Sequence, residues 1–185
     1  MRIEVLSGSP RSNSVTRRLA LHLTQALQQQ TGHEVGMIDL EDWDLPPVKA
    51  VFTSVQDAPD QYKPVAERMF AAEAFVLVTP EYNGSYTSEL KNLLDHFPKQ
   101  THKTFAIATA SPGALGGIRA AMQMQQLIFA LFGIGSPYML ITPQVDKKFS
   151  PEGELLDPSF QKSIDIFIKE FLWLAEKLTV EKVPV

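Results

Sequence analysis

The chain has 185 residues, 44% of them hydrophobic and 21% charged, which suits one globular domain with a sizeable core. It contains no cysteine, which excludes disulfides, thiolate nucleophiles and cysteine-ligated metals. The net charge is −4, without a basic block or an apolar run that could span a bilayer, so we expect neither nucleic acid nor a membrane as partner. Residues 1–185 are therefore expected to form a single domain. The first residues lead straight into a strand pattern without signal-peptide features, so a cytoplasmic location is expected.

A hydroxyl-rich stretch, residues 7–16, follows a short apolar run at residues 3–6 and precedes a segment with helical periodicity. A strand, a turn and a helix in this order direct backbone N–H groups and a helix dipole at one point. Arg11 adds a planar cation suited to an oxygen anion. The turn lacks the lysine of an ATP-binding loop and the glycines of a pyrophosphate loop, which favours a phosphate monoester. The alternative is an ordinary helix cap by one of residues 12–14.

The rest of the chain alternates between strand and helix patterns. Residues 41–64 are an irregular, proline-containing stretch, which we interpret as a surface excursion and a candidate rim of the site. Asp157 and Pro158 suit the start of the last helix. This alternation predicts an α/β fold, a doubly wound parallel sheet with ligands at the carboxyl ends of its strands. Strands are expected at residues 3–6, 35–40, 75–78, 104–109 and 138–141, and helices at residues 15–31, 65–74, 87–97, 117–132 and 157–178.

Two further loops leave the same edge of this predicted sheet, at residues 79–86 and 110–119. Asn83-Gly84 permits backbone angles with positive φ, and Tyr82 and Tyr86 offer flat apolar faces with polar tips. Gly116-Gly117 could leave room for a planar ligand, or could only shape the turn into the next helix. The loops are suited to a flat heteroaromatic ligand, which needs polar groups around its edge.

Three motifs in these loops resemble those of the NAD(P)H-dependent FMN reductases, a family of flavodoxin-like fold that includes quinone, azo-compound and chromate reductases. The first is G-S-x-R-x-x-S at residues 8–14. The second is P-E-Y-N-G-S at residues 80–85, followed by L-K-N at residues 90–92 and by Asp95. The third is S-P-G-x-x-G-G at residues 111–117. They stand in the family's order and spacing, and the resemblance covers nearly the whole chain.

The resemblance implies a five-stranded sheet of order 2-1-3-4-5 with helices on both faces. It also implies FMN as cofactor, with NADPH or NADH as co-substrate giving a hydride to flavin N5. A small acceptor (a flavin, quinone, azo compound or metal oxyanion) would then take the electrons, so we assign no catalytic side chain and no metal. The cofactor-binding residues implied are Ser9, Arg11, Ser14, Val15, Thr16, Pro80, Glu81, Tyr82, Asn83, Gly84, Ser111, Gly113 and Gly116. Among them, the phosphate would be surrounded by Ser9, Arg11, Ser14 and Thr16.

The sequence also departs from the family's pattern. Thr87-Ser88 stands where relatives often have Pro-Gly, and His96-Phe97 stands where they often have Trp. An arginine expected near Gln125 is missing, which leaves the choice of substrate open.

Two rival functions come from other classes. One is a flavodoxin-type electron carrier, which binds FMN without a pyridine nucleotide site, and the other is a protein of this fold that acts by interaction alone.

Residues 127–132 are apolar on every side of their predicted helix, which indicates either a crowded core or a partner subunit. The resemblance favours the partner, as a homodimer or homotetramer.

Overall fold

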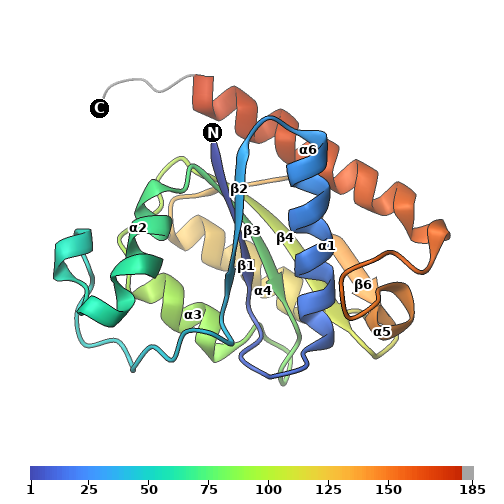
Figure 1. The fold of residues 1–185 in the computed structure, drawn as a ribbon, viewed down its shortest axis with the longest axis horizontal. Helices are drawn as coiled ribbons and strands as arrows, with labels where there is room; N and C mark the ends of the chain where they lie inside the picture. The colour runs from blue at the N-terminus through green and yellow to red at the C-terminus, as the bar shows by residue number, and fades with distance from the viewer. Residues whose placement is uncertain (181–185) are drawn as a thin grey trace.

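The structure is a computed structural model, and it describes residues 1–180. Its centre is a parallel sheet in which β2 (Glu34–Asp39), β1 (Arg2–Ser7), β3 (Ala74–Thr79) and β4 (Thr104–Ser111) lie side by side in that order (Figure 1). The next position beside β4 completes the order 2-1-3-4-5, so the predicted topology is confirmed.

That last position is filled by two short strands in place of the one strand expected at residues 138–141. β5 (Ile134–Gly135) pairs with the first residues of β4, and β6 (Leu140–Pro143) pairs with its last four residues. Between them, Ser136 still donates its N–H to the carbonyl of Phe105 at 2.7 Å. Pro137 follows and has no N–H to donate, which interrupts the ladder.

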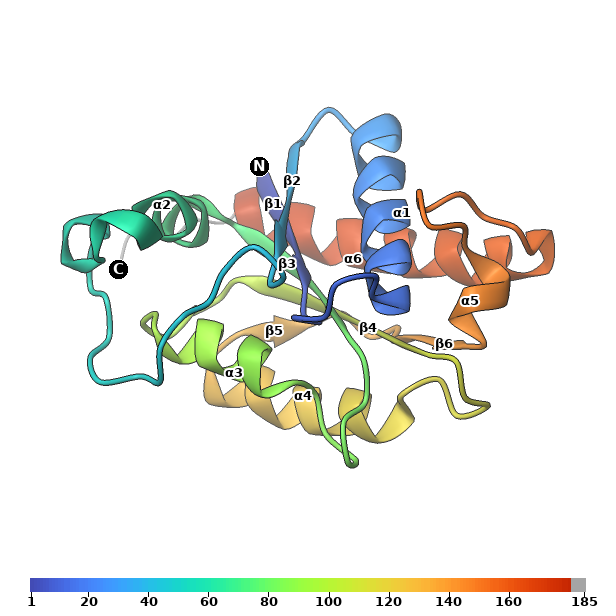
Figure 2. The ribbon, with the colours of Figure 1, turned by 60° about the horizontal axis from the view of Figure 1, so that its bottom comes forward.

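The helices lie in two layers, one on each face of the sheet. α1 (Val15–Gln30) and α6 (Gln161–Val180) cover one face, while α2 (Lys63–Ala71), α3 (Ser88–Asp95) and α4 (Ile118–Ala130) cover the other. Figure 2 shows α1 and α6 above the sheet and α3 and α4 below it. No helix within residues 1–180 combines the length and the apolar character needed to cross a membrane.

Strand β3 shows how the two layers share one strand. Ala74, Val76 and Val78 pack toward α1 and α6, while Phe75 and Leu77 pack toward the other layer. All five side chains are fully buried. This explains why the sequence of β3 is a continuous apolar run instead of an alternating one.

The long stretch after β2 is tied to α3 and is not free. Asn92 donates its side-chain amide to the carbonyls of Leu45 and Pro46 at 2.9 and 3.0 Å. Phe52 donates its N–H to the carbonyl of His96 at 2.8 Å. The stretch contains two short 3₁₀ helices, η1 (Val55–Asp57) and η2 (Asp60–Tyr62), and leads directly into α2.

The last helix begins with a 3₁₀ turn, η3 (Pro158–Phe160), after the short helix α5 (Val145–Lys148). Asp157 is the N-cap of that turn, as predicted, and its carboxylate accepts from the N–H of Ser159 at 3.1 Å. The ammonium of Lys148 lies 2.7 Å from the same carboxylate. The pKa of Asp157 is lowered to about 2, first by the hydrogen bond from Lys148 and next by that from Ser159.

Gly116 and Gly117 shape the turn into α4. Their φ angles are +61° and +87°, in the left-handed region. A Cβ at Gly116 would lie 2.7 Å from the backbone nitrogen of Pro143, and one at Gly117 would lie 2.9 Å from Cβ of Thr109. Close approach to the sheet is enough to explain both glycines, as in the second of the two interpretations given above, and the first, room for a planar ligand, stays a prediction.

Gly116→Ala should therefore lower the free energy of unfolding by about 1–3 kcal/mol, because it adds left-handed strain and a clash with the backbone. Gly32→Ala is the matched control: an added Cβ there meets no atom within 4 Å, so a change below about 0.5 kcal/mol is expected. Urea unfolding of both variants measures the difference. Equal stabilities would show that the turn does not need glycine.

Candidate functional site

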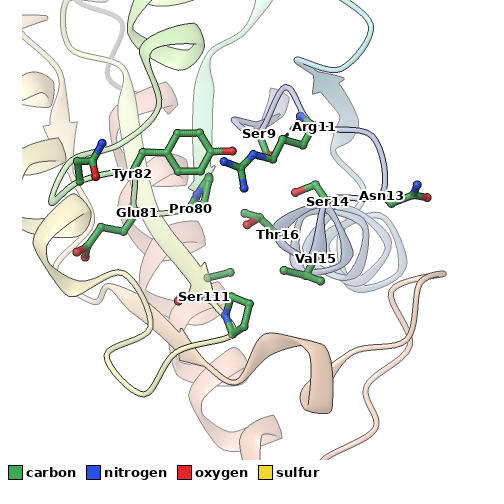
Figure 3. Close-up of a pocket in the computed structure, with 13 residues that line it drawn as sticks. Ser9, Arg11, Asn13, Ser14, Val15, Thr16, Pro80, Glu81, Tyr82 and Ser111 are labelled. Carbon is green, nitrogen blue, oxygen red and sulfur yellow. Dashed lines mark hydrogen bonds between the residues drawn. The ribbon is translucent and has the colours of Figure 1, made fainter.

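A cavity of about 540 Å³ opens where β1, β3 and β4 end (Figure 3). Its volume lies in the range typical of small-molecule sites, about 300–1,000 Å³. The loops after these three strands supply its walls, as the predicted topology requires. The lining residues are Ser9, Arg11, Asn13, Ser14, Val15, Thr16, Pro80, Glu81, Tyr82, Asn83, Ala110, Ser111 and Pro112.

Most of the residues predicted from the sequence thus come together around one cavity. Gly84, Gly113 and Gly116 do not line it. Three lining residues were not predicted. Ala110 and Pro112 flank Ser111, so their position follows from the prediction of Ser111 as a cavity residue. The third is Asn13, which has a φ of +59° and stands just before the start of α1.

The end of the cavity at the start of α1 presents unpaired backbone donors. Ser14 occupies the N-cap position of α1, but its side chain makes no hydrogen bond to the helix. The structure therefore does not support the alternative of a side-chain cap at Ser14. Ser9 is only 2% exposed, and within residues 1–180 no group accepts a hydrogen bond from its N–H. Such donors at a helix N-terminus fit an anion.

The opposite wall is a tight hairpin that carries Tyr82. Asn83 and Gly84 have φ angles of +51° and +83°, which confirms the prediction of positive φ and corresponds to a type I′ turn. Tyr82 and Ser85 exchange backbone hydrogen bonds of 2.8 and 3.1 Å across this turn. Gly84 therefore serves the hairpin and not the cavity wall.

The Tyr82 side chain reaches across toward Arg11 (Figure 3). The guanidinium carbon of Arg11 lies 4.5 Å from the centre of the ring, in a cation–π contact. The hydroxyl oxygen of Tyr82 is buried and has no hydrogen-bond partner in the described part of the chain. A buried hydroxyl without a partner beside a cavity indicates a group that a ligand can satisfy.

Tyr86 does not share this position. It does not line the cavity and instead packs, partly buried, against the core beneath α2, α3 and α4. Burial is the main reason that the pKa of its phenol is raised. Of the two tyrosines, Tyr82 alone lines the cavity, and its role toward a ligand stays a prediction.

The hairpin is attached to α4 by two side-chain contacts. The Glu81 carboxylate accepts from the backbone N–H of Arg119 at 3.0 Å and from its guanidinium at 3.1 Å. Ser85 donates its hydroxyl to the side-chain oxygen of Gln123 at 2.6 Å. The carboxylate also lies at the N-terminus of α4, where the helix dipole favours negative charge. Glu81 is thus engaged in holding the loop.

The other residues of the second motif have structural contacts. Leu90 is fully buried, and Lys91 and Asp95 form an ion pair one turn apart on α3. Asn92 holds the long loop, as described above. No residue of that loop is among those that line the cavity, so the interpretation of residues 41–64 as its rim stays a prediction. Part of the loop lines a separate pocket of about 240 Å³ instead.

Known proteins with similar sequences indicate the family to which the chain belongs. The sequence model of the family described as NADPH-dependent FMN reductase matches residues 1–142. An FMN-dependent NADPH-azoreductase of Staphylococcus aureus is 29% identical over 175 residues, covering 91% of this chain and 92% of the relative.

Solved structures show the same fold. FerB, a flavoenzyme NAD(P)H:(acceptor) oxidoreductase from Paracoccus denitrificans, superposes with a TM-score of 0.74 at 22% identity, covering 95% of this chain and 97% of its own. A flavodoxin mutant from Pseudomonas aeruginosa superposes with a TM-score of 0.57 at 19% identity, covering 92% and 99%.

The family match spans more than half of the chain, and the cavity walls carry the motifs on which the resemblance rests. The chain therefore belongs to the NADPH-dependent FMN reductase family and is an oxidoreductase that uses FMN with NAD(P)H as co-substrate.

Proposed function

We propose that FMN binds in the 540 Å³ cavity and that the enzyme passes electrons from NAD(P)H to a small acceptor such as a flavin, quinone, azo compound or metal oxyanion. The observation that carries the proposal is the uncapped start of α1, which opens into the same cavity as Tyr82. When bound, FMN supplies the hydride-accepting and electron-delivering chemistry. The names of the azoreductase and of FerB support an NAD(P)H donor and a small acceptor.

The turn before α1 would hold the phosphate. Ser9, Ser14 and Thr16 line this part of the cavity and offer hydroxyl donors in addition to the N–H groups of the first helical turn. Arg11 offers a guanidinium for a charge-assisted, paired contact with phosphate oxygens. The α1 dipole adds to the attraction for negative charge.

The remaining walls would hold the flavin ring. Residues 80–83 and 110–112 bring peptide groups from two loops to the cavity, which suits the polar edge of a flat ring. Tyr82 offers an aromatic face and a hydroxyl that lacks a partner among the described residues. These walls would orient the ring and the nicotinamide, and holding two reactants about 3–3.5 Å apart lowers the barrier to such a transfer.

Arg11→Ala should raise the dissociation constant for FMN by about tenfold to a hundredfold, because charge-assisted hydrogen bonds contribute about 1.5–3 kcal/mol. Lys49→Ala is the control, since Lys49 is an exposed cation in the long loop and does not line the cavity. Titration of flavin-free protein with FMN measures both variants. An unchanged affinity in Arg11→Ala would overturn the phosphate assignment.

A second test separates the reductase from a flavodoxin-type carrier. Anaerobic addition of NADPH or NADH to the FMN-loaded protein should bleach the oxidised-flavin absorbance, because the proposed reductase brings the nicotinamide beside the flavin ring and transfers its hydride. Repeated reduction of an added quinone should follow. A protein that keeps its oxidised spectrum with both nucleotides, yet is reduced by dithionite, would be a carrier.

The proposed assembly is a homodimer or homotetramer that uses the last turn of α4 and the residues just after it. Phe129 and Phe132 are 75% and 61% exposed, whereas Leu127 and Ile128 are buried in the core. A small pocket of about 170 Å³ lies beside Phe129. Two large exposed aromatic side chains beside a pocket suit a subunit contact.

The proposed reductase function also places the enzyme in the cytoplasm, together with its NAD(P)H.

Phe129→Glu should convert the assembly to monomers without unfolding the chain, because the ring is exposed and makes no part of the core. Gln126→Glu places the same charge on an exposed position of the same helix and should leave assembly unchanged. Light scattering at micromolar concentration, with urea unfolding as the check on stability, measures the outcome. A monomeric wild-type protein would contradict the proposal.

A further inference from the structure

Thr87 connects the turn between β1 and α1 to the start of α3. Its side chain is 1% exposed and does not line the cavity. The hydroxyl donates to the carbonyl of Gly8 and accepts from the N–H of Leu90 at 3.2 Å, so it is also the N-cap of α3. One buried hydroxyl thus connects a helix N-terminus to the backbone just before Ser9.

The Gly8–Ser9 peptide is held tightly at this point. Gly8 donates its own N–H to the carbonyl of Val78 at 2.7 Å, and an added Cβ at Gly8 would lie only 2.9 Å from that oxygen. In a planar trans peptide the C=O and the following N–H point in opposite directions. Because Thr87 holds the Gly8 carbonyl on the side of α3, the Ser9 N–H points away from α3.

The Ser9 N–H is the donor that this geometry leaves for a ligand. Ser9 lines the cavity, is 2% exposed, and its N–H finds no acceptor in the part of the chain that the structure describes. An unpaired buried backbone donor is rare in folded proteins, which indicates that a bound group satisfies it.

We propose that Thr87 is a positioning residue for the phosphate of FMN: its hydroxyl orients the Gly8–Ser9 peptide so that the Ser9 N–H donates to a phosphate oxygen. The inference rests on the proposed cofactor site. The hydrogen bonds run in one direction, from the Leu90 N–H to the Thr87 hydroxyl, to the Gly8 carbonyl and, through the peptide, to the Ser9 N–H. Each bond in such a chain polarises the next, which strengthens the donor at its end.

The simpler explanation is that Thr87 only caps α3. The two explanations differ in what they predict for riboflavin, which has the flavin ring and ribityl chain but no phosphate. A loss of stability or of cavity shape would weaken the binding of FMN and of riboflavin alike. A misdirected Ser9 N–H would weaken the binding of FMN alone.

The test titrates flavin-free Thr87→Val and Thr87→Ser proteins with FMN and, separately, with riboflavin. We expect Thr87→Val, which keeps the shape and loses the hydroxyl, to raise the dissociation constant for FMN about tenfold, with riboflavin changed less than about twofold. Thr87→Ser should bind both like the wild type. If Thr87→Val does not fold, as urea unfolding would show, Thr87→Ala against Thr87→Ser isolates the hydroxyl in the same way.

Arg11→Ala in the same titrations tells failure of the inference from failure of the site. One outcome is that Arg11→Ala weakens the binding of FMN alone, while Thr87→Val weakens the binding of both ligands equally or of neither. In that case Thr87 is not a positioning residue and the phosphate site stands. If neither variant weakens FMN, the proposed phosphate site itself is wrong, and the inference falls with it.

Discussion

The parallel pairing of β1, β3 and β4 is the constraint on which the cavity depends. Ser7 at the end of β1 pairs with Val78, and Thr79 at the end of β3 pairs with Thr109. The three loops therefore leave the sheet at nearly the same level and on the same edge. The two faces of β3 differ in size, with Phe75 and Leu77 on one side and smaller side chains on the other. A slip of one residue would exchange these two sets, so packing against both helix layers opposes it.

The cavity walls are held by the protein's own contacts. The first loop is fixed by Gly8 against Val78, and the second is fixed by Glu81 against the first turn of α4. Contacts of this kind set the positions of the walls independently of a ligand, so little ordering has to accompany binding. The contact between Arg11 and Tyr82 differs, because it joins two loops across the cavity itself.

The sequence predicts the strands, their order and most cavity residues, because apolar runs and loop motifs are local signals. It does not tell where a side chain goes once the chain turns back on itself. Tyr82 and Tyr86 are equivalent in the sequence, yet the type I′ hairpin between them leaves one in the cavity and sends the other to the core. Gly116 lies so close to the backbone of Pro143 that a Cβ would not fit, and the sequence does not show that these two segments meet. The roles of Asn92 and Thr87 depend on partners 46 and 79 residues away, which no local pattern indicates.

Helix α4 shows how one element serves two parts of the molecule. Its last apolar residues include a buried pair, Leu127 and Ile128, and the exposed Phe129, and the exposed Phe132 follows just after the end of the helix. Its first turn binds the Glu81 carboxylate and so holds the hairpin of Tyr82. The helix has 13 residues and is about 20 Å long, and backbone hydrogen bonds connect its successive turns from the hairpin contact to Phe129. A partner subunit that covers the two phenylalanines would therefore also restrain the helix to which the cavity wall is attached.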